Sequence, residues 1–218
     1  MPLLGGWDAD PLWASVYDWS VEHRRLGGAL WRVGTGSPLE RLYAAAAPVG
    51  EVPAGGAVLD VPVGGGVALR ALRPGQGARY VACDLSPAML ARAASRAAAY
   101  GVREQVETVA ADVGSLPFDD ASFDLVVSLT GLHCFPEPRR AVEEMVRVLR
   151  PGGAISWSTL LEDSGLRTLP MRTVGRRAGL LGPGVTAREL TGWLRALRVE
   201  ATLERSGPFA YVTGSLGG

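Results

Sequence analysis

The sequence of 218 residues predicts an α/β fold: a doubly wound, mostly parallel seven-stranded sheet with an antiparallel hairpin at its C-terminal edge. Three observations predict it. Short apolar runs, typical of buried parallel strands, recur along the chain. Helical periodicity separates these runs at short spacing, which implies right-handed crossovers. The last two apolar runs flank Ser206-Gly207-Pro208, a turn signal between paired strands.

The N-terminal region has helical patterning. Leu12, Val16 and Trp19 recur near the 3.6-residue period, and Asp10 precedes Pro11 as a helix start. We expect one helix over residues 11–33 and a second over 38–47. Residues 1–50 are therefore predicted to form a helical cap on a larger domain, residues 51–218.

Strands and helices then alternate. The predicted strands are residues 57–61, 80–83, 106–110, 123–129, 153–160, 199–205 and 209–215, and the predicted helices are residues 67–73, 87–100, 138–149 and 186–197. Ser86 and Thr186 are the expected N-caps of two of these helices. Residues 164–184 form a broken helical stretch, and we expect residues 162–184 to be an insertion that caps the substrate side.

The composition excludes several classes of protein. All 22 basic residues are arginine and balance 22 acidic residues, and there is no lysine and no asparagine. A P-loop hydrolase and a pyridoxal enzyme both need a lysine, so neither is compatible with this chain. The neutral balance argues against a nucleic-acid partner. No apolar run approaches the roughly 20 residues of a membrane span.

The cysteines and the N-terminal sequence bear on the cellular location that we expect. Cys83 and Cys134 lie far apart with no C-x-x-C, so we expect no metal site and no disulfide framework. The N-terminus lacks the basic region of a signal peptide. We therefore expect a soluble, cytoplasmic protein without an integral membrane segment. Its oligomeric state cannot be read from the sequence.

A glycine-rich turn follows the first predicted strand, in the run Asp60-Val61-Pro62-Val63-Gly64-Gly65-Gly66. In open α/β sheets ligands bind at the carboxyl ends of strands, and Asp84, at the end of the next strand, could accept both ribose hydroxyls of an adenosine. The dinucleotide pattern G-x-G-x-x-G fits badly, because its third glycine falls on Leu69 or Val67. The turn therefore suits an adenosine without a diphosphate, although a plain loop is the alternative.

The block ADVGSLPFDDASFDLVVSLTGLHCFPEPRRAVEEMVRVLRPGG, residues 111–153, carries a family resemblance. It resembles the class I S-adenosylmethionine-dependent methyltransferases, in particular the small-molecule group that includes quinone C-methyltransferases. The resemblance covers residues 57–160. It implies a Rossmann-like fold, S-adenosyl-L-methionine as cofactor and a small-molecule methyl acceptor.

The resemblance also implies roles for single residues. Asp60, Pro62, Gly64 and Gly66 would hold the methionine end of the cofactor, Asp84 the ribose, Leu85, Met89, Asp112 and Val113 the adenine, and Ser128 and Leu129 the methionine portion and methyl group. Pro62 departs from the glycine usual in the family and lacks an N–H. This departure keeps open a cofactor-binding protein without turnover, and a nucleotide-linked oxidoreductase is a further alternative.

Methyl transfer from a sulfonium is an in-line displacement, so the protein mainly orients the acceptor and excludes water. His133, on the loop after the fourth strand, is the candidate catalytic base, and a structural role in that loop is the alternative. His23 is expected to be solvated, and Trp13 and Tyr17 either cover the cofactor or pack in the core. Apolar residues in 162–184 favour a small, partly apolar acceptor.

Overall fold

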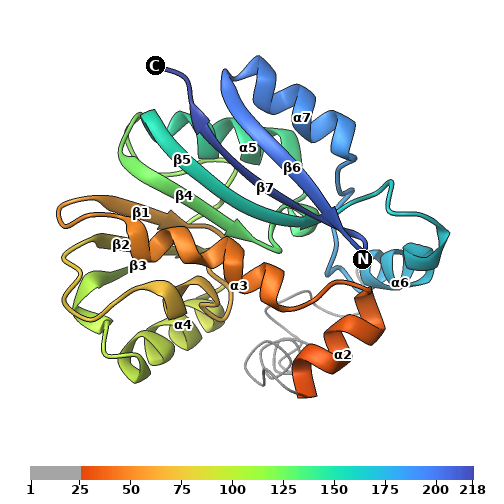
Figure 1. The fold of residues 1–218 in the computed structure, drawn as a ribbon, viewed down its shortest axis with the longest axis horizontal. Helices are drawn as coiled ribbons and strands as arrows, with labels where there is room; N and C mark the ends of the chain where they lie inside the picture. Colours follow the sequence, from red (N-terminus) through yellow and green to blue (C-terminus); the bar gives the residue numbers. More distant parts are fainter. Residues whose placement is uncertain (1–25) are drawn as a thin grey trace.

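The computed structural model describes residues 26–218 (Figure 1). Seven strands form one sheet in the order β3-β2-β1-β4-β5-β7-β6. Strands β1 to β5 are parallel, and β7 pairs antiparallel with both β5 and β6. The predicted fold class is confirmed. The strands are β1 Ala57–Asp60, β2 Arg79–Asp84, β3 Val106–Ala110, β4 Phe123–Leu129, β5 Leu149–Leu160, β6 Val199–Ser206 and β7 Phe209–Leu216.

Helices cover both faces of the sheet (Figure 1). The core on one face joins Leu42 and Ala93 of the covering helices to Tyr80 and Leu125 of the strands. The core on the other face joins helical Met145 and Leu190 to Trp157 of β5. The first face is covered by α2 Leu26–Thr35, α3 Glu40–Ala46 and α4 Pro87–Ala99, and the second by α5 Pro138–Arg147 and α7 Ala187–Ala196.

The segment after the glycine turn differs from the prediction. The helix expected over residues 67–73 is wrong: a single 3-10 turn, η3 Ala68–Ala71, stands there. Gly66 has a positive φ, and Arg73 precedes Pro74, which disfavours helical backbone at residue 73. Too few residues remain between these two limits to repay the cost of starting an α-helix.

The remaining short elements precede β1 or lie in the connections between strands. The 3-10 helices are η2 Ala47–Glu51, η4 Arg103–Gln105, η5 Leu132–Cys134 and η6 Leu166–Thr168, and the last leads into α6 Leu169–Arg177. The broken helical stretch predicted after β5 is therefore η6 and α6, which lie beyond the carboxyl ends of β4 and β5 (Figure 1). No helix in residues 26–218 is long and apolar enough to cross a membrane.

The strand order reverses between β1 and β4. From β1 the chain builds outward through β2 to β3, and it then returns to place β4 on the other side of β1. At such a switch point the two connections diverge and leave a crevice at the carboxyl ends of the strands. The glycine turn after β1 and the loop after β4 both lie at this position. The sheet thus places these two connections at its switch point, where open α/β sheets bind ligands.

The start of α7 offers a test of local stability. Thr186 and Glu189 form a capping box: the Thr186 hydroxyl accepts the Glu189 N–H at 3.2 Å, and the Glu189 carboxylate accepts the Thr186 N–H at 2.9 Å. We expect Thr186→Ala to lower the free energy of unfolding by about 1 kcal/mol, the usual value of an N-cap. Thr186→Ser keeps the hydroxyl and is the control in urea denaturation. Equal losses in the two variants would contradict the role of the cap.

Candidate active site

A buried carboxylate organises the crevice. Asp84, at the end of β2, accepts the Gly64 N–H at 2.9 Å through Oδ2 and the Ser86 N–H at 2.9 Å through Oδ1. Ser86 in turn caps α4, its hydroxyl accepting the Met89 N–H at 3.4 Å. Asp84 therefore holds the turn after β1 against the start of α4.

Two glycines give this turn its shape. Gly64 and Gly66 have φ angles of 50° and 83°, in the left-handed region that favours glycine. A Cβ on Gly66 would also lie 2.7 Å from a Leu69 methyl carbon and 3.4 Å from the Ala93 Cα. The turn therefore packs against α4 at a position where there is no room for a side chain.

Pro62 is accommodated by another glycine. The Val61–Pro62 peptide bond is cis, and a Cβ added to Gly131 would lie 2.1 Å from the Pro62 Cδ. Gly131 belongs to the loop after β4, so the missing side chain there makes the space that the Pro62 ring fills. Val61 and Val63 keep their backbone hydrogen bonds to neighbouring strands, at 2.9 and 2.8 Å. The turn thus retains its form with proline in it.

Asp60, at the end of β1, carries a second buried carboxylate. It is 2 % exposed, and the hydroxyl of fully buried Tyr80 donates to its Oδ2 at 2.5 Å. Burial raises the Asp60 pKa to about 7; the Tyr80 hydrogen bond opposes this rise and the charge of Asp84 adds to it. Two neighbouring carboxylates make this end of the crevice favourable for a cation, such as an ammonium group.

Ser128 and Leu129 complete the crevice from β4. Ser128 is 1 % exposed, and its hydroxyl has no hydrogen-bond partner among the described residues. A buried polar atom without a hydrogen-bond partner is rare in folded proteins. A bound ligand would supply the partner that the Ser128 hydroxyl lacks. The hydroxyl would lie 3.0 Å from a Cβ on Gly131, so it faces the loop that Pro62 also contacts. Ser128 is therefore placed to hydrogen-bond a bound molecule.

A small cavity lies at the β3 side of the crevice. It has a volume of about 150 Å³ and is lined by Asp112, Val113, Gly114, Ser115, Phe135, Pro136, Glu137 and Arg140. Asp112 accepts the Gly114 N–H at 2.8 Å through Oδ1. Its other oxygen makes no hydrogen bond to a described residue and can accept from an exocyclic amine. Met89 is buried near the start of α4, whereas Leu85 is 68 % exposed.

His133 is held by the backbone of β5. Its Nδ1 accepts the Leu160 N–H at 3.0 Å, which places the ring proton on Nε2. Although the residue keeps some exposed surface, its dense surroundings lower its pKa to about 4. A neutral ring whose Nδ1 is occupied and whose Nε2 is protonated is a hydrogen-bond donor at neutral pH. The geometry favours the structural alternative, and the catalytic role of His133 stays a prediction.

The structure adds two residues that the sequence did not single out. Tyr80 binds Asp60, and Gly131 makes room for Pro62. A tyrosine inside an apolar strand gave a weak signal for the first, and nothing in the local pattern marked the second. Trp13, Tyr17 and His23 lie outside the described residues. Within residues 26–218, no group of three His, Cys, Asp or Glu side chains could hold a metal ion.

Part of the chain is similar to known methyltransferases. Residues 59–156 match the family described as "Methyltransferase domain". The chain is 43 % identical over 143 residues to the demethylmenaquinone methyltransferase of Clavibacter sepedonicus, covering 65 % of this chain and 52 % of that protein. It is 35 % identical over 128 residues to the phthiotriol/phenolphthiotriol dimycocerosates methyltransferase of Mycobacterium tuberculosis strain H37Ra, covering 55 % and 46 %. The chain thus spans about half the length of these two curated relatives.

Solved structures agree on the fold. A geranyl diphosphate methyltransferase, in complex with GPP and sinefungin, superimposes with a TM-score of 0.66 at 15 % identity, covering 81 % of this chain and 77 % of that one. At this level of identity the match concerns the fold alone.

The buried charge of Asp60 predicts a dependence of stability on pH. Its pKa is raised from 3.8 to about 7, so the folded state favours the protonated form. Protonation of Asp60 in the folded state therefore contributes its full stabilisation below about pH 4, and this contribution is lost as the pH rises through about 7. We expect Asp60→Asn, which stays neutral, to raise the free energy of unfolding at pH 8 by about 2–4 kcal/mol and to flatten its pH dependence between 4 and 7.

Two variants serve as controls in urea denaturation at several pH values. Asp120→Asn changes an exposed carboxylate and should leave this dependence in place. Tyr80→Phe removes the hydrogen bond that lowers the Asp60 pKa and should move the midpoint to higher pH. An Asp60→Asn protein that is no more stable at pH 8 would contradict the assignment.

A second prediction concerns His133. His133→Phe leaves the Leu160 N–H without its acceptor, and we expect a loss of about 1–3 kcal/mol in the free energy of unfolding. His133→Asn offers Oδ1 close to the position of Nδ1 and should recover part of that loss. Thermal denaturation compares the two variants, and equal losses would show that the hydrogen bond is unimportant.

Proposed function

We propose that this chain is a class I S-adenosylmethionine-dependent methyltransferase that transfers the cofactor's methyl group to a small, apolar or lipid-like acceptor by in-line displacement. The observation that carries the proposal is the crevice at the β1/β4 switch point. There a buried hydroxyl without a partner, two buried carboxylates and a glycine turn converge.

The residues present fit this cofactor. Asp60 suits the ammonium of the methionine portion, because an ammonium neutralises the charge that burial makes costly. The Ser128 hydroxyl would gain the hydrogen bond that it lacks. The Asp84 carboxylate, at the end of β2, would accept the ribose hydroxyls, and the cavity beside Asp112 would take the adenine. When bound, the cofactor supplies a methyl group already activated by its sulfonium.

The chain's own residues then bind, orient and exclude water. The loop after β4 and the segment at 162–184 lie beside the carboxyl ends of β4 and β5, where the acceptor would approach. Orientation and removal of water account for most of the acceleration in such a displacement. With no lysine in the chain and His133 bonded through Nδ1, an acceptor that loses a proton would pass it to a carboxylate, a tyrosine or water.

The acceptor class rests on the relatives and on the surface near the crevice. The two curated relatives are named for demethylmenaquinone and for phthiotriol dimycocerosates. In this chain, exposed Leu166, Leu169 and Met171 lie on the segment that follows β5. Together they favour an apolar acceptor over a highly charged one.

The oxidoreductase alternative is less well supported. A dinucleotide needs its pyrophosphate at the N-terminus of a helix that starts at the glycine turn. Here a 3-10 helix of four residues follows that turn, which offers little of the dipole and few aligned N–H groups.

Calorimetric titration tests the proposal. We expect S-adenosylmethionine and S-adenosylhomocysteine to bind and NAD not to bind. Asp84→Ala should weaken cofactor binding about 100-fold, because charge-assisted hydrogen bonds to the ribose are lost together with the support of the turn. Asp119→Ala, in the loop before β4, is the control and should bind normally. Binding of NAD without S-adenosylmethionine would refute the proposal.

Turnover is measured separately, with radiolabelled S-adenosylmethionine and a panel of quinols and hydroxylated lipids. Transfer of label into a solvent-extractable product is the expected result. Tight cofactor binding with no transfer to any acceptor would favour a binding protein instead.

A further inference from the structure

The segment from Ser164 to Arg188 is unusually basic for this chain. It holds five arginines and no acidic residue, although the whole chain has a formal net charge of zero. It forms η6 and α6 and the loop that leads to α7. With the flanking Glu162, Asp163 and Glu189, residues 162–189 hold five arginines and three acidic residues, which leaves a small positive net charge at this end of the sheet.

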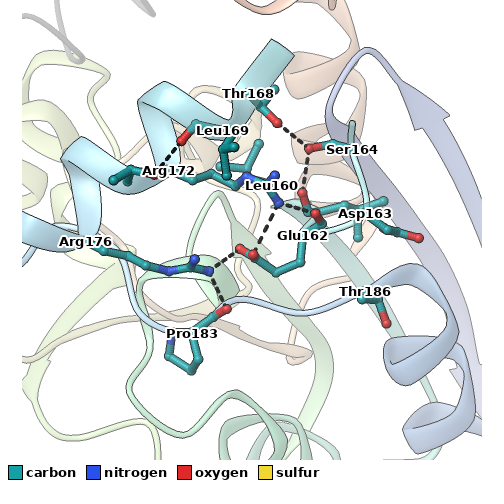
Figure 2. Close-up of polar contacts among 12 residues, drawn as sticks. Leu160, Glu162, Asp163, Ser164, Thr168, Leu169, Arg172, Arg176, Pro183 and Thr186 are labelled. Carbon is teal, nitrogen blue, oxygen red and sulfur yellow. Dashed lines mark hydrogen bonds and ion pairs between the residues drawn. The ribbon is translucent and has the colours of Figure 1, made fainter. Parts of the chain in front are cut away.

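The polar contacts of α6 are directed toward the protein. Figure 2 shows Arg172 and Arg176 converging on Glu162, at the end of β5. Arg172 is 6 % exposed, and its Nη1 lies 3.2 Å from Glu162 Oε2. Arg176 Nη2 lies 2.6 Å from Glu162 Oε1 and donates to the Pro183 carbonyl at 2.6 Å. This cluster fixes how the helix is rotated about its axis.

Apolar side chains are exposed elsewhere on η6 and α6. Leu166 of η6 and Leu169, Met171 and Val174 of α6 are 84 %, 48 %, 45 % and 62 % exposed, and we call them the α6 apolar face. They are four of the seven large apolar side chains that are exposed within residues 26–218. Met171 and Val174 lie on the side of α6 away from Arg172 and Arg176. Arg177 is also exposed and makes no ion pair with a described residue. Arg172 is thus buried while Met171 and Val174 are exposed, the reverse of the usual arrangement in a surface helix.

We propose that the α6 apolar face docks on the surface of an anionic lipid bilayer. Amphipathic helices that bind membranes combine an apolar side, which enters the headgroup region, with flanking basic residues that attract anionic lipids. The α6 apolar face and the exposed Arg177 beside it have this combination.

The position of α6 relates this docking to the proposed methyl transfer. This step rests on the proposed apolar acceptor, since such a molecule would be dissolved in the bilayer. The helix follows β5 through η6 and lies at the carboxyl end of the sheet (Figure 1). A bilayer on the α6 apolar face would therefore lie on the same side of the protein as the crevice, where an acceptor could enter without crossing water.

Co-sedimentation of the full chain with vesicles tests the proposal. Vesicles of phosphatidylcholine with 30 % phosphatidylglycerol (roughly the anionic content of a charged leaflet) are compared with pure phosphatidylcholine. We expect clear binding to the anionic vesicles, weakened at high salt, and little to the neutral ones. Val174→Asp and Arg177→Glu should each lower the partition coefficient about tenfold or more.

Arg73→Glu is the matched control, because it makes the same charge change before β2, at the other end of the sheet. It should bind vesicles almost as well as the unchanged protein. S-adenosylmethionine titration accompanies each variant. A variant that binds the cofactor but not the vesicles shows a loss of docking alone. If the proposed function is wrong, neither the unchanged protein nor any variant will bind the cofactor.

Three results would overturn the proposal. One is absent or equal binding to the two kinds of vesicle. Another is a dimer in solution that Val174→Asp dissociates, which would make the face a contact between copies. The third is a Val174→Cys thiol that resists a water-soluble reagent in the free protein, which would mean that the chain covers the face itself.

Discussion

The site depends on one buried carboxylate that satisfies two backbone N–H groups from different elements. Asp84 binds Gly64 in the turn after β1 and Ser86 at the start of α4. Neither N–H has a partner within a strand or a helix, so each would be costly to bury alone. Because Asp84 places Gly64, it also places Gly66 against α4 and Pro62 against the loop after β4. The crevice takes its shape from this bridge.

The same end of the sheet holds two neighbouring buried carboxylates, which the stability of the fold does not require. Asp60 is buried beside Asp84, and burial raises its pKa to about 7 despite the hydrogen bond from Tyr80. Such a group makes the free protein less stable at neutral pH than a neutral residue would. The arrangement makes sense if a cation binds there, since the bound cation would relieve the cost.

The absence of lysine has a structural consequence. Several loops are held by arginines that donate hydrogen bonds to two or more acceptors. A guanidinium has five N–H donors in a fixed planar arrangement, and a lysine ammonium is a poor substitute for it in such contacts. Arg147 donates to the carbonyls of Leu116 and Phe118 as well as to Glu144. Arg176 does the same for the loop after α6, bonding the Gly182 and Pro183 carbonyls and Glu162. These contacts are also what turns the apolar side of α6 outward.

The sequence by itself determined the features that depend on local patterns. Alternating strands and helices, the terminal hairpin, the glycine turn, Asp84 and the caps at Ser86 and Thr186 could all be predicted, because periodicity and turn chemistry act over a few residues. The short η3 was missed, since helical periodicity does not reveal that Gly66 and Pro74 leave too little chain for an α-helix.

Only the tertiary structure decided how distant residues meet. Tyr80 reaches Asp60 across 20 positions, His133 is bonded by Leu160 across 27, and Gly131 accommodates Pro62 from another strand connection. The outward side of α6 depends in the same way on Glu162. Each of these depends on strand order and burial, which set pKa values, free lone pairs and available space, and no short stretch of sequence contains that information.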